Sequence, residues 1–149
     1  MKYKTPVSVL VLVHTIDLQV LLLERADRPG FWQSVTGSMD EGETLLQTAQ
    51  RELAEETGIV AGPGMLVDWK RQSRYEIYPH WRHRYAPGVN HNTEHVFGLT
   101  LPAVRDIVLA PREHLAFVWL PWREAADRVF SRSNAEVIRE LPERLASGA

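Results

Sequence analysis

The stretch GSMDEGETLLQTAQRELAEETGI, residues 37–59, decides the fold because it holds a loop, a complete helix and the residues that begin and end that helix. Its first part, residues 37–43, combines glycines with acidic side chains and is typical of a loop. Thr44, with Gln47 three residues later, matches the capping box that starts a helix. Gly58 occupies the position of a helix-ending glycine. The stretch therefore predicts a helix between Thr44 and Gly58.

The second half of this helix gathers negative charge, because it contains Glu52, Glu55 and Glu56. At about 100° per residue, these glutamates spread over roughly 100° of one side of the helix. Like charges four residues apart destabilise a helix by about a few tenths of a kcal/mol, so the cluster works against folding. The stripe expected to pack on a sheet consists of Leu46, Ala49 and Leu53. The carboxylates are therefore expected at the margin of the buried face, with Glu56 nearest to it.

The acidic cluster has two interpretations. It is either a solvated helix face with an internal Arg51–Glu55 pair, which is what charge runs usually are, or a site for a hard divalent cation. Three details favour the cation: Arg before Glu is the less favourable order for a helix pair, the carboxylates border the core, and an acidic glycine loop leads into the helix. Magnesium takes such oxygen ligands and bridges to substrate phosphates.

Composition excludes several other classes of function. The chain has 149 residues, which suits one domain over 1–149, and a net charge of −2, which does not favour nucleic acid as the main partner. It has no cysteine, which excludes disulfides, thiolate metal sites and thiol catalysis and fits a reducing, cytoplasmic location. The apolar run Val7–Val13 is too short to cross a membrane and is expected to be a buried strand.

The remaining sequence predicts an α/β sandwich whose strand order cannot be deduced. The region 79–92 reads as a loop, and a short helix is expected over Trp122–Phe130. A last helix is expected from Ser133, where Glu136 completes a second capping box, towards Leu145, with a break or kink near Pro142. Expected strands besides the first are 20–23, 31–35, 66–70, 74–78, 95–101 and 115–120.

Gly37, Glu43 and the run RELAEETGI over 51–59 together resemble the Nudix box, G-x5-E-x7-R-E-U-x-E-E-x-G-U with U aliphatic, and every specified position is met. The resemblance implies a Nudix-type α/β/α sandwich with a mixed β-sheet. It also implies hydrolysis of a nucleoside diphosphate linked to another group, with Mg²⁺ as cofactor, for which Mn²⁺ can substitute. Glu52 and Glu56 would be the main metal ligands, Glu55 would assist, and Gly37 would offer its carbonyl. Arg51 would orient the glutamates, and Glu43 would brace the loop.

A narrower resemblance covers most of the chain. The segments FWQSVTGS (31–38), RYEIYPHWRHRYAPGVNHNTEHVFGL (74–99) and REHLAFVWL (112–120) are similar to the bacterial dihydroneopterin triphosphate pyrophosphatases. These enzymes of folate biosynthesis remove pyrophosphate and leave dihydroneopterin monophosphate. Glu113 would be an additional metal carboxylate. The positions that would contact substrate are Lys4, Arg25, Thr36, Tyr75, Glu76, Ile77, Tyr78 and Ser131.

Several alternatives stay open at this point. Arg25 could cap a strand, Ser131 could be a turn residue, and Tyr75 and Tyr78 could be aromatic residues of an edge strand. The box also fits a Nudix hydrolase of deoxynucleoside triphosphates or dinucleoside polyphosphates. A ligand-binding Nudix domain without catalysis is disfavoured because such domains usually lose box glutamates. The histidines are too irregularly spaced to predict a metal site. The expected partner is a small-molecule substrate, with no membrane or nucleic acid, and the oligomeric state and the catalytic base are not predicted.

Overall fold

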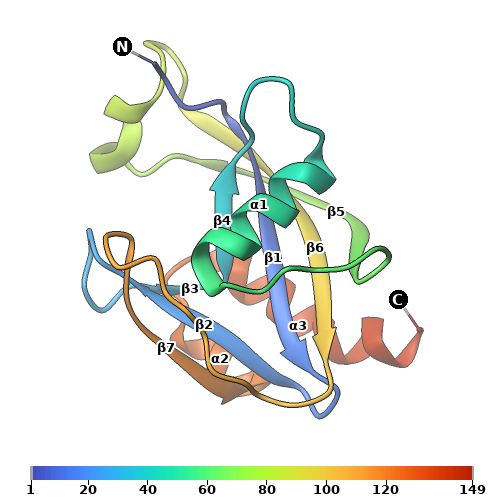
Figure 1. Cartoon of the computed structure of the whole chain (residues 1–149). Helices are drawn as coiled ribbons and strands as arrows, with labels where there is room; N and C mark the ends of the chain where they lie inside the picture. The colour runs from blue at the N-terminus through green and yellow to red at the C-terminus, as the bar shows by residue number, and fades with distance from the viewer. Residues whose placement is uncertain (1, 149) are drawn as a thin grey trace.

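The computed structural model describes residues 2–148, so Met1 and Ala149, the ends of the expected domain, lie outside the described residues. Within the described part, seven strands form one mixed sheet (Figure 1). Its main strand order is β3-β2-β1-β6-β5, while β4 pairs with β1 and β7 pairs with β2. The strands are β1 (Val7–Thr15), β2 (Gln19–Arg25), β3 (Trp32–Gln33), β4 (Val35–Ser38), β5 (Leu66–Glu76), β6 (His91–Leu101) and β7 (His114–Pro121).

Helices cover both faces of this sheet (Figure 1). Helix α1 (Leu45–Thr57) packs on one face, and α2 (Trp122–Arg128) and α3 (Arg132–Ala146) pack on the other. A short 3-10 helix, η1 (Pro79–Arg84), follows β5. The expected α/β/α sandwich with a mixed sheet is confirmed. Among residues 2–148, no helix is long and apolar enough to cross a membrane.

Strand β1 organises the two cores because it is buried on both faces. It runs parallel to β6 along its whole length, and it pairs antiparallel with β4 through its first half and with β2 near its end. Alternate side chains of a strand point to opposite faces. Val9 therefore packs in the core under α1, and Leu10 packs in the core under α2 and α3. Both side chains are at most 2% exposed, as the apolar run predicted.

Helix α1 has the ends that the sequence predicted. The Thr44 hydroxyl accepts from the Gln47 backbone N–H at 3.1 Å, and the Gln47 side chain accepts from the Thr44 N–H at 2.9 Å. Gly58 adopts a φ of +77°, which a residue with a Cβ adopts only at a cost. Ala49 and Leu53 are buried, but the prediction for Leu46 was wrong, since it is 44% exposed. The buried face is instead rotated towards Glu52 and Glu56.

Several predicted strand boundaries were wrong. The expected strand 31–35 is split into β3 and β4, because Gln33 pairs with β2 and Val35 pairs with β1. The expected strands 66–70 and 74–78 form the single strand β5, which carries an irregularity between Asp68 and Gln72. The expected loop 79–92 contains η1, and β6 already begins at His91.

The last two helices also differ from the prediction at their ends. Helix α2 ends at Arg128. Helix α3 is capped by Ser131, whose side chain accepts from the Asn134 N–H, so the capping box expected from Ser133 was wrong. The helix continues through Pro142 without the break that was considered. The helix begins after Ser131 rather than at Ser133 because Ser131 has the extended backbone conformation of an N-cap residue.

Candidate active site

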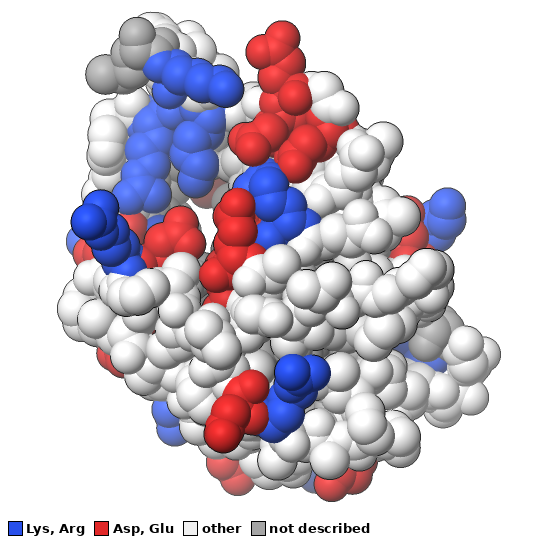
Figure 2. Space-filling model, in the orientation of Figure 1, with Lys and Arg blue, Asp and Glu red and all other residues white. Residues whose placement is uncertain are grey.

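A cleft of about 1130 Å³ opens beside the short strand β4. Figure 2 shows this hollow at the upper left, with basic side chains gathered along one side and acidic side chains beside it. The structure brings every sequence-predicted site residue to this cleft. They are Lys4, Arg25, Thr36, Gly37, Arg51, Glu52, Glu55, Glu56, Tyr75, Glu76, Ile77, Tyr78, Glu113 and Ser131. Their common location is a finding, whereas the role of each residue stays a prediction.

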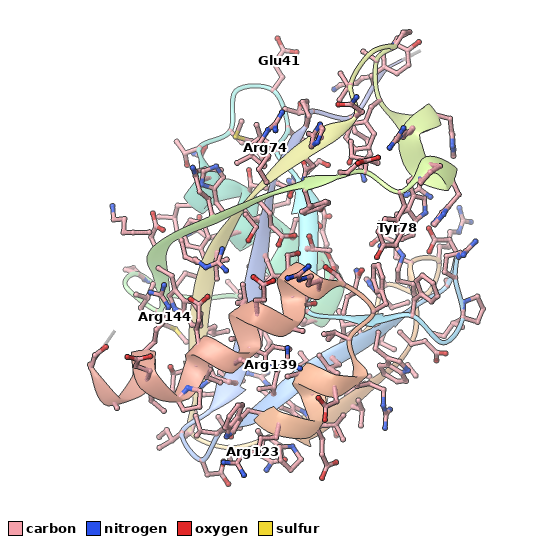
Figure 3. The ribbon with its side chains drawn as sticks, turned by 180° about the vertical axis from the view of Figure 1, so that it is seen from behind. Glu41, Arg74, Tyr78, Arg123, Arg139 and Arg144 are labelled. Carbon is pink, nitrogen blue, oxygen red and sulfur yellow. The ribbon has the colours of Figure 1, made fainter. Side chains whose placement is uncertain are left out.

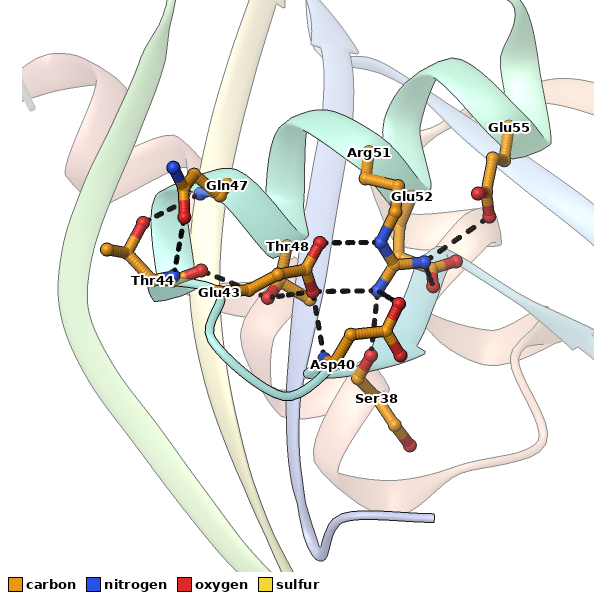
Figure 4. Close-up of polar contacts among 9 residues, drawn as sticks. All are labelled: Ser38, Asp40, Glu43, Thr44, Gln47, Thr48, Arg51, Glu52 and Glu55. Carbon is orange, nitrogen blue, oxygen red and sulfur yellow. Dashed lines mark hydrogen bonds and ion pairs between the residues drawn. The ribbon is translucent and has the colours of Figure 1, made fainter. Parts of the chain in front are cut away.

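Arg51 fixes the loop before α1 to the helix itself (Figure 4). Its guanidinium donates to Glu43 at 2.7 Å, to the Ser38 carbonyl at 3.0 Å and to Glu52 at 2.6 Å. Glu43 also accepts from the Thr48 hydroxyl at 2.9 Å. The Arg51 hydrogen bonds, which outweigh burial, lower the pKa of Glu43 to about 2. The carboxylate of Glu52 is therefore held in one position by a permanently charged partner.

Gly37 gives the Glu52 carboxylate its place against strand β4. A Cβ atom at this position would overlap the carboxylate carbon and both carboxylate oxygens of Glu52. The backbone of Gly37 is not in the left-handed region, so the requirement for glycine is one of space rather than conformation. The Glu52 carboxylate can therefore lie close to the main chain of Gly37.

Glu56 carries a buried carboxylate that lacks a full set of partners. The residue is 2% exposed, and its Oε1 atom accepts no hydrogen bond among the described residues. The nearest basic atom is Nε2 of His114, 3.6 Å from Oε1. Burial, followed by the neighbouring Glu52, raises the pKa of Glu56 well above its ordinary value. An orphaned carboxylate beside a second one is a site that a cation would stabilise.

The donor set fits a hard divalent cation. Oxygen atoms are available from Glu52, Glu56 and the Gly37 carbonyl, and such oxygens are the ligands of magnesium and manganese. The side chain of Glu55 is 52% exposed, and Glu113 lies exposed in the loop before β7. Among residues 2–148, no three carboxylate or histidine side chains are already gathered as a complete ligand set.

Basic side chains form another wall of the cleft. Arg25 pairs with Asp27 at 2.7 Å, and Arg84 reaches the same carboxylate at 3.0 Å. Loss of hydration in the cleft, followed by the charges of Arg84 and Arg25, lowers the pKa of Lys4. Three cations therefore face one another with a single carboxylate between them, which leaves positive charge for an anion such as a polyphosphate.

Aromatic side chains lie near these cations. Tyr78 and Trp81 stack with ring centroids 5.5 Å apart, and Phe130 meets Trp81 edge-on at 5.8 Å. The guanidinium of Arg25 lies over the Trp81 ring at 4.3 Å. Figure 3 shows Tyr78 beside η1, and its side chain is 39% exposed. A flat ring can stack on such a surface.

The remaining predicted residues also have structural contacts. Thr36 donates to the Val9 carbonyl at 2.9 Å, Ile77 is 4% exposed, and Glu76 pairs with Arg82. Ser131 is the N-cap of α3, as described above, rather than the turn residue that was the alternative. These contacts do not prevent the same side chains from facing a ligand, since all of them line the cleft.

Sequence reasoning missed a buried polar group on the cleft wall. Asn92 donates to the Ser8 hydroxyl at 2.7 Å and to the Tyr75 hydroxyl at 3.0 Å, and Glu94 lies two residues further along β6. Both residues are at most 5% exposed. The sequence carries no clear signal for them, because residues 91–95, HNTEH, are all polar and the expected strand began only at His95.

The sheet, its helices and the box geometry define a Nudix hydrolase. The NUDIX domain family matches residues 4–141, and the chain belongs to this family. Nudix hydrolases generally use divalent metal cations, which agrees with the donor set described above.

Comparison with individual proteins is more specific than the family match. The chain is 50% identical over 142 residues to the dihydroneopterin triphosphate diphosphatase of Escherichia coli strain K12, covering 93% of each chain. It is 40% identical over 143 residues to the enzyme of that name from Haemophilus influenzae, covering 94% of this chain and 89% of that one. The solved structure of the E. coli dihydroneopterin triphosphate pyrophosphohydrolase superposes with a TM-score of 0.88 at 48% identity, covering 94% of this chain and 97% of that one.

Proposed function

We propose that the chain hydrolyses dihydroneopterin triphosphate to dihydroneopterin monophosphate and pyrophosphate, with Mg²⁺ as the cofactor and Mn²⁺ as a substitute. The observation that carries the proposal is that one continuous cleft joins the box carboxylates, three basic side chains and a stacked aromatic pair. These features suit the metal, the polyphosphate and the flat ring of such a substrate. The names of the 40–50% identical relatives point to the same reaction.

The box residues have the following roles in this proposal. Glu52, Glu56 and the Gly37 carbonyl would hold the metal, with Glu55 and Glu113 contributing from the cleft rim. When bound, the metal neutralises the diphosphate and lowers the pKa of a water. Arg51 keeps Glu52 in position through the 2.6 Å hydrogen bond. Preorganised charge of this kind favours the transition state because it need not rearrange during the reaction.

The other cleft residues would bind the rest of the substrate. Lys4 and Arg25 would contact the triphosphate, and Thr36 and Ser131 would donate hydrogen bonds. Tyr75, Glu76, Ile77 and Tyr78 would form the wall next to the ring. The ring has an extended apolar surface, so stacking contributes about 1–3 kcal/mol and tolerates many ring types.

The alternative is a nucleoside triphosphate or a dinucleoside polyphosphate, because stacking alone does not separate a pterin from a purine. A substrate panel decides between them. We expect dihydroneopterin triphosphate to exceed GTP and dATP by at least about tenfold in kcat/KM, or roughly 1.4 kcal/mol in transition-state binding. Chromatography should detect pyrophosphate and the monophosphate as products. Release of orthophosphate, or a preference for a nucleotide, would contradict the proposed function. The cytoplasmic location stays a prediction.

A further inference from the structure

Four buried side-chain atoms among the described residues lack a hydrogen-bond partner, and all four belong to residues that line the cleft. They are Oε1 of Glu56, Nδ1 of His114, Oδ1 of Asn92 and Oε1 of Glu94. An unpaired buried polar atom destabilises the folded state, so native proteins seldom retain one without a reason. Glu56 belongs to the box and His114 contacts it. Asn92 and Glu94 lie outside the box, so the lack of partners for their buried atoms needs another explanation.

The two unexplained atoms lie on the face of the sheet opposite to α1. Glu94 is in register with Ser8 of β1, so it shares the face of Leu10, which packs under α2 and α3. Gly37 is in register with Val9 and therefore faces α1 and Glu52. The edge strand β4 separates the two ends of the cleft. A ligand that reaches both Glu52 and Glu94 must pass this edge.

Thr36, on β4, lies between the two ends of the cleft. Its side chain shares the face of Leu10, and therefore of Glu94, whereas the next residue, Gly37, faces α1 and Glu52. The carboxylates therefore lie on either side of one residue. A short ligand with a flat ring joined to a triphosphate can reach both ends.

The inner end of the cleft, which we call the recess, consists of Ser8, Tyr75, Asn92 and Glu94. Its buried atoms without a hydrogen-bond partner, Oδ1 of Asn92 and Oε1 of Glu94, are both acceptors when the carboxylate is ionised. Both N–H groups of the Asn92 amide are used, one towards Ser8 and one towards Tyr75, which leaves Oδ1 as an acceptor. An ionised carboxylate is an acceptor only and can accept two parallel hydrogen bonds. The recess therefore requires a ligand edge that carries adjacent donors.

A 2-amino-4-oxopyrimidine ring has such an edge, because its ring N–H and its amino group are adjacent donors. Pterins and guanine share this edge, whereas adenine presents an acceptor beside its amino group. We infer that Glu94 reads the 2-amino-4-oxopyrimidine edge of the substrate ring, with Asn92 as a second acceptor. This inference rests on the proposed function and adds a specificity-determining residue to it. It explains how the site selects a ring that stacking alone cannot select.

Burial also raises the pKa of Glu94 to about 7, an effect that the Arg71 charge reduces. The free carboxylate is therefore poorly stabilised by the protein alone. Two donors from a ligand would supply the missing hydrogen bonds, and charge-assisted bonds of this type are about twice as strong as neutral ones.

The test compares Glu94→Gln with Glu143→Gln, a control on the exposed side of α3 and outside the cleft. Glutamine keeps the shape of the side chain but replaces one acceptor by a donor. For Glu94→Gln we expect kcat/KM for dihydroneopterin triphosphate and GTP to fall about 100-fold. The buried amide N–H of the glutamine would then face an N–H donor of the substrate ring, and neither would have an acceptor. The value for ATP should stay within about threefold, since adenine lacks the adjacent donors. Both variants should melt at or above the wild-type temperature.

A binding measurement without metal gives a second readout. Neopterin, which carries the ring without phosphates, should quench the tryptophan fluorescence of the wild type and of Glu143→Gln. For Glu94→Gln its dissociation constant should rise at least about tenfold. Equal losses for GTP and ATP, or unchanged neopterin binding, would overturn the assignment of Glu94. A wild-type preference for GTP over dihydroneopterin triphosphate would instead overturn the proposed function and leave the assignment of Glu94 intact.

Discussion

Replacement of Gly37 by alanine tests the geometry of the carboxylates most directly. The new Cβ atom would overlap the carboxylate of Glu52, while the backbone conformation itself accepts alanine. Glu52 must therefore move, although it is 8% exposed and held by Arg51 at 2.6 Å. An off-rotamer side chain costs about 0.5–1.5 kcal/mol. At about 2–4 °C per kcal/mol for a chain of this size, that lowers the melting temperature by about 1–6 °C.

The loss of activity should be much larger than the loss of stability. Displacement of a catalytic group by about 1 Å can cost about 100-fold, so we expect kcat/KM to fall by at least that factor. The assay is steady-state pyrophosphate release at saturating magnesium, with the melting temperature measured in the same buffer. Gly62→Ala is the matched control, because its Cβ would meet only Met65 at an ordinary distance of 3.5 Å.

A double substitution tests whether Gly37→Ala lowers activity by displacing Glu52. If alanine acts only by moving Glu52, then adding Gly37→Ala to Glu52→Gln should change kcat/KM little further. Additive losses would mean that Gly37 acts independently of Glu52. Wild-type activity of Gly37→Ala would refute the close approach of Glu52 to β4 as a requirement for catalysis.

Three further predictions concern the metal, the buried glutamate and acid stability. Chelator should abolish turnover, and magnesium or manganese but not the larger calcium should restore it; full activity in EDTA would contradict the metal-dependent mechanism. Glu56→Gln should lower kcat by several orders of magnitude while the melting temperature holds or rises, because the buried charge is removed; an unfolded or fully active variant would indicate a structural role. The folded pKa of Glu43 is lowered to about 2, so its stabilisation is present above its ordinary pKa near 4.5 and is lost as pH falls towards 2. Melting temperature against pH should therefore fall less steeply below pH 5 in Glu43→Gln than in the wild type, and identical slopes would exclude this contribution.

The helix α1 could be predicted from the sequence because its signals are local. The capping box at Thr44 and the glycine at position 58 act over a few residues, and the structure has both. Burial was less predictable, since the sheet and not the helix decides which side faces inward. Leu46 is exposed and Glu52 is buried because the carboxylate side of α1 lies over β4.

Features that depend on distant segments could not be predicted. The division of residues 31–35 into β3 and β4 follows from pairing with two different strands. The recess likewise requires Ser8 from β1 and Tyr75 from β5 to meet Asn92 on β6. Strand order was not deducible from the sequence, so these residues could not be placed next to one another in advance.

The parallel pairing of β1 with β6 also has a consequence for the time course of folding. During synthesis the apolar strand β1 leaves the ribosome well before its parallel partner, which begins only at His91. Contacts between residues so distant in sequence form slowly, and an unpaired apolar strand is prone to aggregate meanwhile. The central strand must therefore stay soluble or chaperoned until β6 has been translated.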